Sequence, residues 1–324
     1  MLAFSADEGC TSRGMGSTTS LVAYPCVERA RLTELALHAR EGVAPVLMVD
    51  DAQVRLAAEV ARARRHARAS RSTSTSRSLP KLYFGVRRSP VRVRRHRACG
   101  RPRRNGERGV RLVGVMGYEA QIAGLPDATG HASDLAIRAL KRLSFADVRR
   151  RRGAIVDALR SDGHPIRLVN GGGTGSLDVT SRDPSVTELA AGSGLFAPTS
   201  FDAFAGFRHR PAAGFALSVT RRPSPELVTC FGGGYVASGP PSAAKVPAPW
   251  LPEGLTLLPH EMAGEVQTPL RVPSEVSLAI GDPVFFRHAK AGELCERFAR
   301  LLLISGDRVV DEVATYRGEG ESFG

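Results

Sequence analysis

A glycine-rich loop is the segment of this sequence best suited to chemistry. Residues 170–176 read Asn-Gly-Gly-Gly-Thr-Gly-Ser and follow the apolar residues Ile166, Leu168 and Val169. Glycines let backbone N–H groups approach and converge on an anion. The pattern is neither the GxGxxG fingerprint nor a P-loop with its GK[ST]. We therefore predict that Asn170–Ser176 binds the phosphate of a small cofactor rather than a nucleotide. A tight strand-to-helix turn is the alternative.

A second glycine loop, Gly192-Ser193-Gly194, lies one predicted strand after the first. Neighbouring loops at one face of a parallel barrel often converge on a phosphate. We therefore expect this second loop to close the same phosphate site, although three residues of this type are a weak signal by themselves.

Candidate metal ligands lie nearer the C-terminus. His288, Glu293 and Cys295 offer an imidazole, a carboxylate and a thiolate, which are the usual ligands of zinc. Their spacing matches no standard zinc motif. The alternative is a loop histidine, a solvated glutamate and a buried cysteine without a metal.

The elements that must position these residues alternate between strand and helix in the N-terminal two-thirds. Apolar runs predict strands at 21–24, 45–49 and 111–116, and apolar residues at helical spacing predict helices that include 32–39 and 54–61. Residues 132–162 are predicted to be helical in two pieces. After about residue 212, short strand-like runs separated by Pro and Gly replace this pattern.

The expected fold class is therefore α/β. We predict an incomplete parallel β/α (TIM-like) barrel over residues 1–212 and a smaller β-rich domain over residues 213–324.

The composition indicates the cellular environment that we expect for the protein. No run of about 18 apolar residues is present, so no transmembrane helix and no membrane partner are expected. The N-terminus lacks a basic region followed by an apolar core, so no signal peptide is expected. The five cysteines are scattered and odd in number, which favours a reducing cytoplasm over a disulfide framework.

The net charge of +13 comes from one segment. Residues 61–109 contain sixteen arginines and Lys81 against the single acidic residue Glu107, so the rest of the chain is slightly acidic. Three interpretations are open: an RNA- or DNA-binding insertion, a disordered low-complexity insertion, and a stretch translated out of frame from a GC-rich gene. The scarcity of aromatic residues argues against base stacking. We favour the third interpretation, because a barrel strand is missing from the pattern at 62–109.

Three longer motifs resemble one enzyme family. They are Val113–Gly124, Val169–Ser176 and Arg287–Phe298, and the segment Tyr316–Gly320 fits as well. Together they resemble the amino acid deaminase/aldolase family, which is related to D-threonine aldolase and D-serine dehydratase and has an alanine-racemase-type barrel. The resemblance covers residues 21–60, 79–92 and 109–324.

This resemblance implies pyridoxal 5′-phosphate (PLP) as cofactor at the C-terminal mouth of the barrel, a small amino acid as substrate and a homodimer as the assembly. It also implies a divalent metal, zinc or manganese, near Glu293 and Cys295, although the family's usual His-x-Cys is not present. The cofactor-binding residues predicted in this way are Tyr118, beside the ring, and Asn170, Gly171, Gly172, Gly173, Thr174, Gly175, Gly192, Ser193 and Gly194, around the phosphate.

One expected residue is missing from the resemblance. The family's Schiff-base lysine ends the first barrel strand, and PLP chemistry requires such an amine. The four lysines here are Lys81, Lys141, Lys245 and Lys290, and none stands at that position. Residues 1–5 resemble the end of a later strand, so we expect the first strand to be absent.

The sequence therefore predicts a PLP-dependent lyase for D- or β-hydroxy amino acids, acting by aldol cleavage or by dehydration and deamination, with impaired activity. Racemase activity is a lesser possibility. The alternatives are a non-catalytic PLP- or phosphate-binding remnant and nucleic-acid binding through residues 61–109.

Overall fold

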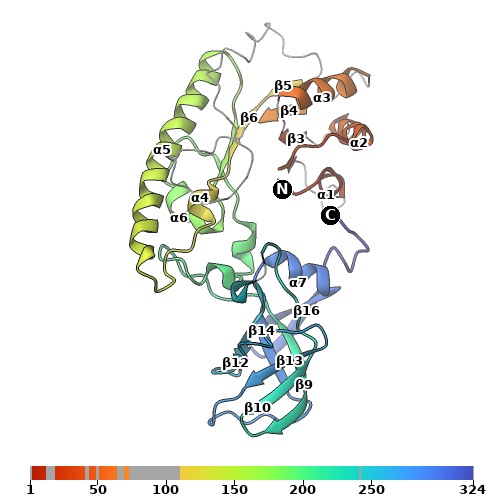
Figure 1. The fold of residues 1–324 in the computed structure, drawn as a ribbon. Coiled ribbons are helices and arrows are strands. Elements are labelled where there is room, and N and C mark those ends of the chain that lie inside the picture. Colours follow the sequence, from red (N-terminus) through yellow and green to blue (C-terminus); the bar gives the residue numbers. More distant parts are fainter. Residues whose placement is uncertain are drawn as a thin grey trace. The chain divides into compact units, whose positions relative to one another are not determined.

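The computed structural model divides the chain into two compact units, between Ala191 and Gly192 (Figure 1). The residues that it describes are 2–11, 19–40, 44–48, 51–63, 69–72, 110–240 and 242–323. Each unit has its own apolar core, so each is described by itself.

Parallel strands build the first unit. A five-stranded sheet has the order β1-β2-β3-β4-β5, and a three-stranded sheet has the order β6-β7-β8. All pairs in both sheets are parallel within the described residues. The strands are β1 (Leu2–Ala3), β2 (Thr19–Val22), β3 (Ala44–Met48), β4 (Ala69–Ser72), β5 (Val110–Leu112), β6 (Gly114–Gly117), β7 (Leu168–Gly171) and β8 (Glu188–Leu189).

Helices follow β1, β2, β3, β6 and β7, as connections between parallel strands require. They are α1 (Ala6–Thr11), α2 (Arg29–Arg40), α3 (Asp51–Ala63), α4 (Ala120–Ala123), α5 (Ser133–Ser161) and α6 (Leu177–Thr180). The predicted helical stripe of α2 is confirmed, because Leu32, Leu35 and Ala36 are buried in one core cluster with Val22 and Leu47 of the neighbouring strands. The predicted strands at 21–24, 45–49 and 111–116 correspond to β2, β3 and the β5–β6 pair.

The prediction of two helical pieces at 132–162 is wrong. α5 is a single helix of 29 residues. Its buried residues Ser144, Val148, Arg152, Val156 and Leu159 recur every three or four positions. One buried face therefore continues past Gly153 without a break.

Strand β4 corrects a second prediction, that the Arg/Ser-rich segment leaves a barrel strand missing. Residues 69–72 pair in parallel with β3 on one side and with β5 on the other. The ladder is made by backbone N–H and C=O groups, so a strand position does not demand apolar side chains. Residues 73–109, which include Lys81, lie outside the described residues, so the three interpretations of this segment stay untested.

An antiparallel sheet dominates the second unit. Its strand order is β11-β14-β9-β10-β13-β12, and a separate hairpin pairs β15 with β16. The strands are β9 (Phe215–Ser224), β10 (Leu227–Phe231), β11 (Ala248–Leu251), β12 (Thr256–Leu257), β13 (Gln267–Arg271), β14 (Pro283–Arg287), β15 (Arg300–Ser305) and β16 (Arg308–Ala314). This β-rich character agrees with the sequence-based expectation.

The predicted division after residue 212 coincides with the start of the β strands rather than with the boundary between the compact units. Residues 192–212 make contacts within the second unit. The Thr199 N–H donates to the carbonyl of His288 at 3.0 Å, and Arg287 pairs with Asp202 at 2.7 Å. This stretch contains two 3₁₀ segments, η2 (Gly192–Leu195) and η3 (Thr199–Phe201), and precedes β9.

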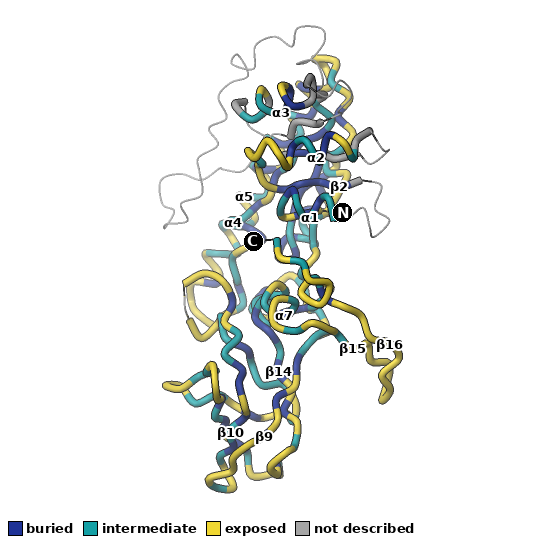
Figure 2. The backbone as a smooth tube through the Cα atoms, turned by 90° about the vertical axis from the view of Figure 1, so that its right-hand side faces the viewer, coloured by how far each residue is buried: buried dark blue, intermediate teal, exposed yellow. Residues whose placement is uncertain are grey.

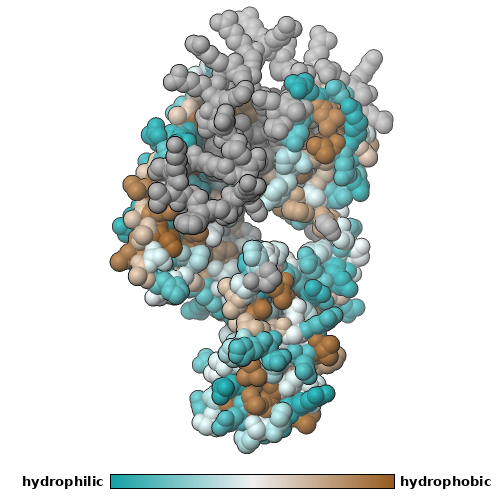
Figure 3. All heavy atoms as spheres, in the orientation of Figure 1, coloured by the Kyte–Doolittle hydropathy of each residue, from teal (hydrophilic) through white to brown (hydrophobic). Residues whose placement is uncertain are grey.

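The β15–β16 hairpin is exposed along most of its length (Figure 2). Several of its exposed side chains are apolar, namely Leu302, Leu303, Ile304, Val309, Val310 and Val313. In the first unit, apolar residues also gather over the N-terminal half of α5, where Leu135 and Leu143 are exposed (Figure 3). None of the described helices is both long enough and apolar enough to cross a membrane.

Candidate functional site

The glycine loop lies at the carboxyl end of β7, a strand with parallel neighbours on both sides. The loop continues into one 3₁₀ turn, η1 (Thr174–Ser176), and then into α6. Gly172 has φ +79°, and a Cβ there would lie 3.3 Å from the Thr180 side chain. A residue with a side chain would be strained at this position. The predicted buried strand before the loop is therefore confirmed, and the loop also leads into a helix, as the alternative of a strand-to-helix turn expected.

Tyr118 lies against this loop. It follows β6, which pairs with β7, so the two carboxyl ends are neighbours. A Cβ on Gly173 would lie only 2.8 Å from Cε2 of Tyr118, so the ring occupies the space that a side chain would need. Tyr118 is 40% exposed. The structure thus brings together two residues predicted for one site, and leaves Tyr118 partly exposed.

A buried ion-pair network holds the loop from the other side. Nη1 of Arg152, on α5, donates to Asp183 Oδ2 at 2.9 Å. Its Nη2 donates to the Glu119 carboxylate and, at 3.1 Å, to the Gly117 carbonyl. The three charged side chains are at most 1% exposed. One cation thus lies between two carboxylates in a region without water-accessible surface.

Glu119 connects this network to the loop. Its Oε2 accepts the Gly172 N–H at 2.7 Å. A Cβ on Gly171 would lie 3.1 Å from the Arg152 guanidinium, so the backbone of β7 packs directly on the cation. The position of the loop therefore depends on Arg152 and Glu119, and sequence reasoning did not predict either residue.

A signal for Arg152 was present in the sequence. Arg152 stands four residues after Val148 and four before Val156, on the stripe that α5 buries. A buried cation needs an acidic partner. Glu119, two residues after β6, is the one acidic residue of the Val113–Gly124 motif and could have been proposed as this partner.

Several loop groups are already used inside the protein. The Gly173 N–H donates to Ser176 Oγ at 3.2 Å, and the Gly172 N–H is taken by Glu119. The Asn170 amide donates to Glu188 Oε1 at 2.6 Å and ties β7 to β8. These contacts assign structural roles to Asn170, Gly172 and Gly173. Their role toward a phosphate stays a prediction, as does that of Gly171, Thr174 and Gly175.

The second glycine loop forms a 3₁₀ segment, η2 (Gly192–Leu195), at the start of the second unit. Because Gly192, Ser193 and Gly194 belong to a different unit from the first loop, their convergence on one phosphate stays a prediction.

The three candidate metal ligands lie near the end of the second unit's sheet. His288 follows β14 and is buried, and burial, together with the positive charge of Arg287, lowers its pKa. Glu293 and Cys295 lie on α7 (Ala291–Arg297), and Glu293 Oε1 accepts the Ser238 N–H at 2.8 Å. Within the described residues, the three do not form a group whose ligand atoms all lie within 4.8 Å of one another. Their metal role stays a prediction.

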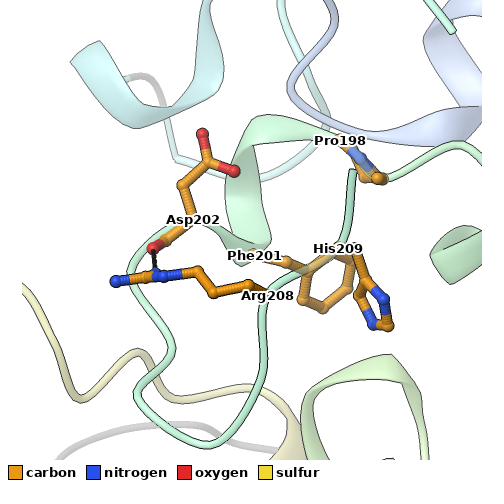
Figure 4. Close-up of a pocket in the computed structure, with 6 residues that line it drawn as sticks. Pro198, Phe201, Asp202, Arg208 and His209 are labelled. Carbon is orange, nitrogen blue, oxygen red and sulfur yellow. Dashed lines mark hydrogen bonds between the residues drawn. The ribbon is translucent and has the colours of Figure 1, made fainter. Parts of the chain in front are cut away.

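A pocket of about 120 Å³, which the sequence did not indicate, lies within the second unit (Figure 4). Arg208 closes one side and donates from Nη1 to the Asp202 carbonyl at 2.6 Å. The lining residues are Ala197, Pro198, Phe201, Asp202, Arg208 and His209. This volume is well below the roughly 300–1,000 Å³ of typical ligand sites. The pocket alone does not make a cofactor site.

Comparisons with known proteins address the fold. No family model matches the chain, and no curated protein matches it either. Solved structures do match. D-threonine aldolase from Filomicrobium marinum has a TM-score of 0.77 at 19% identity, over 98% of this chain and 82% of that chain.

Two other solved structures are similar. D-threo-3-hydroxyaspartate dehydratase from a Delftia species has a TM-score of 0.68 at 19% identity, over 97% of this chain and 83% of that chain. An alanine racemase-like protein from Idiomarina loihiensis has a TM-score of 0.66 at 12% identity, over 93% and 79%. The chain therefore has the alanine racemase-like fold with a β-rich second part, and the predicted fold class is confirmed. The resemblance stated from the motifs holds at the level of the fold.

Proposed function

We propose that the chain is a PLP-binding protein of the lyase type that acts on D- or β-hydroxy amino acids, and that its own catalytic activity is impaired. The observation that carries this proposal is the contact between Tyr118 and Gly173 at the adjoining ends of β6 and β7. It combines an aromatic face with a glycine loop, which are the two elements that a phosphate-bearing aromatic cofactor needs. Solved structures of the same fold include a D-threonine aldolase and a D-threo-3-hydroxyaspartate dehydratase, which supports the substrate class.

The residues present fit the cofactor in part. The partly exposed Tyr118 side chain suits packing beside a pyridine ring, and the Cβ-free backbone at Gly173 lets the Tyr118 ring lie against the loop. PLP, when bound, supplies an electron sink for a carbanion at the substrate Cα. The chain's own contribution is binding and orientation: the loop holds the phosphate, Tyr118 orients the ring, and Glu119 with Arg152 fixes the loop.

Two of the three described lysines are engaged in other contacts, and the third, Lys245, lies in the second unit near Gly239. Lys141, on α5, pairs with Asp127 at 3.0 Å, and both side chains are largely buried. Lys290, in the second unit, donates to Ser238 at 3.0 and 3.1 Å. Both ammonium groups thus have structural partners. We therefore expect reversible PLP binding without a lysine adduct, and little turnover.

A PLP titration of the purified chain, followed by absorbance, tests this proposal. We expect saturable binding at a stoichiometry of one, with no lysine modification by mass spectrometry after borohydride treatment. Gly173→Ala, whose Cβ would displace the Tyr118 ring, should weaken binding about tenfold, which corresponds to roughly 1.4 kcal/mol. Gly153→Ala is the matched control, because no heavy atom lies within 4 Å of its Cβ position.

The outcomes separate the alternatives. Absence of saturable PLP binding would refute the cofactor site. A borohydride-trapped lysine, with release of aldehyde or ammonia from D-threonine, would refute the impairment and leave the lyase assignment standing.

We also propose a homodimer. The exposed apolar side chains of the β15–β16 hairpin support it, because exposed apolar clusters commonly mark association surfaces. The partner that we propose for this hairpin is a second copy of the chain.

A further inference from the structure

We propose that Cys10, Glu34 and His38 form a binding site for a thiophilic divalent metal ion, of which Zn²⁺ is the natural choice. One ligand atom from each residue lies within 4.8 Å of the other two. The site belongs to the first unit and shares no residue with the glycine loop. It is also separate from His288, Glu293 and Cys295, so it does not depend on the proposed function.

Two adjacent helices present these ligands. Glu34 and His38 are four residues apart on α2, so they project from the same face one turn apart. Cys10 lies in the last turn of α1. It packs against the core cluster that also contains Leu32 and Leu35. The ligands are therefore carried by helices that a shared core holds in place, which is the arrangement that a defined metal site requires.

The chemistry of the three donors selects the metal. A thiolate, an imidazole and a carboxylate are the ligand types of zinc sites, and three protein ligands leave the fourth position open. A thiolate disfavours Mg²⁺ and Ca²⁺, which prefer oxygen. Ligand atoms around a tetrahedral zinc lie roughly 3.4–3.6 Å apart. Since the ligand atoms here lie within 4.8 Å of one another, the side chains would have to close by at most about 1.2–1.4 Å.

The surrounding charges favour a cation. Burial, and after it the negative charges of Glu34 and Asp7, raises the pKa of the Cys10 thiol to about 12. A metal ion would replace this thiol proton and neutralise the carboxylates. Arg31 is the opposing charge, with contacts of 2.6 Å to Asp7 and 3.3 Å to one oxygen of Glu34.

The imidazole is also available for coordination. Nδ1 of His38 is buried and has no hydrogen-bond partner among the described residues. Buried polar atoms normally have a partner, and an unpaired one calls for an explanation such as an ion. The unpaired buried nitrogen and the ligand cluster thus both involve His38.

A Co²⁺ titration of the reduced, metal-free full chain tests this inference. We expect a one-to-one complex with a thiolate-to-cobalt charge-transfer band and the visible bands of tetrahedral Co²⁺, both abolished by added Zn²⁺. Cys10→Ser should remove the charge-transfer band, and His38→Gln should weaken Zn²⁺ binding by at least about tenfold. Cys26→Ser, a half-buried cysteine of the first unit that lies outside the ligand group, is the control and should leave both unchanged. Cys295→Ser tests the other candidate ligand set, in the second unit.

Circular dichroism identifies variants that fail to fold, and the two ligand variants can be judged separately. Absence of a one-to-one complex in the reduced chain would overturn the inference. Loss of the charge-transfer band in Cys295→Ser but not in Cys10→Ser would also overturn it, because that result would place the metal on the second unit.

Discussion

Arg152 connects three separate parts of the candidate site. It comes from α5, it binds the end of β6 through the Gly117 carbonyl, and it binds Glu119 and Asp183 on either side. Desolvating three charges is expensive, and their mutual attraction offsets that cost only while the set is complete. The network therefore fixes the geometry of the loop more than it adds to net stability.

Removal of this cation should be strongly destabilising. Arg152→Met leaves two carboxylates buried without a counter-ion, so we expect a loss of about 3–5 kcal/mol in the free energy of unfolding. Urea denaturation followed by circular dichroism measures it. Arg150→Ala, two residues away in an exposed pair with Asp147, is the control and should change stability by less than about 0.5 kcal/mol. A loss below about 1 kcal/mol for Arg152→Met would show that the network is not formed.

At this scale, the sequence predicted the residues that make the loop but not those that hold it. Four glycines within five residues can be recognised from the sequence alone, because their effect on the backbone is local. The pairing of Arg152 with Glu119 and Asp183 spans more than thirty residues in each direction and depends on how α5 packs. Spacing along the chain carries no information on such a pairing unless the buried face of the helix is already known.

The helix α5 is the element that places Arg152. The buried residues from Ser144 to Leu159 form one continuous face, so tertiary packing determines the length of α5. Gly153 weakens the helix only through its low helix propensity. The predicted division into two pieces is wrong because the buried face continues past Gly153.

Substitution at Gly153 tests this continuity. No atom lies within 4 Å of the Cβ position, so Gly153→Ala should stabilise the first unit by about 0.5–1 kcal/mol through helix propensity and reduced chain entropy. The comparison is Gly163→Ala, also in open space but at φ +83°, which should destabilise by about 1–2 kcal/mol. Thermal unfolding of both variants gives the answer, and a destabilising Gly153→Ala would mean that α5 needs a hinge there.

The sequence predicted the other elements correctly where the strand is buried and its residues are therefore apolar. β2, β3 and β7 are buried strands with apolar runs, and they were predicted within a few residues. β4 was not predicted, because its segment is rich in Arg and Ser, although it pairs with β3 and β5. Composition therefore predicts strands that pack against a core. It predicts poorly a polar strand that is held by pairing with its neighbours.

For the whole molecule, the β15–β16 hairpin is the feature that calls for a partner. Ile304 and Val309 are paired across its two strands and are both more than half exposed. Such a cross-strand pair on an exposed hairpin remains costly unless another surface covers it.

We expect Ile304→Lys to weaken the proposed homodimer by at least about tenfold, because a buried ammonium at the interface has no partner. Light scattering over a concentration series measures the association. Ile280→Lys is the matched control, since Ile280 is also largely exposed in the second unit but lies outside the hairpin. Equal association of both variants would remove the hairpin from the interface, and a monomeric unmodified chain would refute the dimer itself.

The buried triad of Arg152, Glu119 and Asp183 has an evolutionary consequence. Because an uncompensated charge in that position is so unfavourable, no member can be exchanged alone without loss of fold. Related chains that replace the arginine by an apolar residue should therefore replace both acids as well. Covariation of these three positions among distant relatives would show that they inherited the ion-pair network that holds the loop, whether or not they kept the catalytic residues.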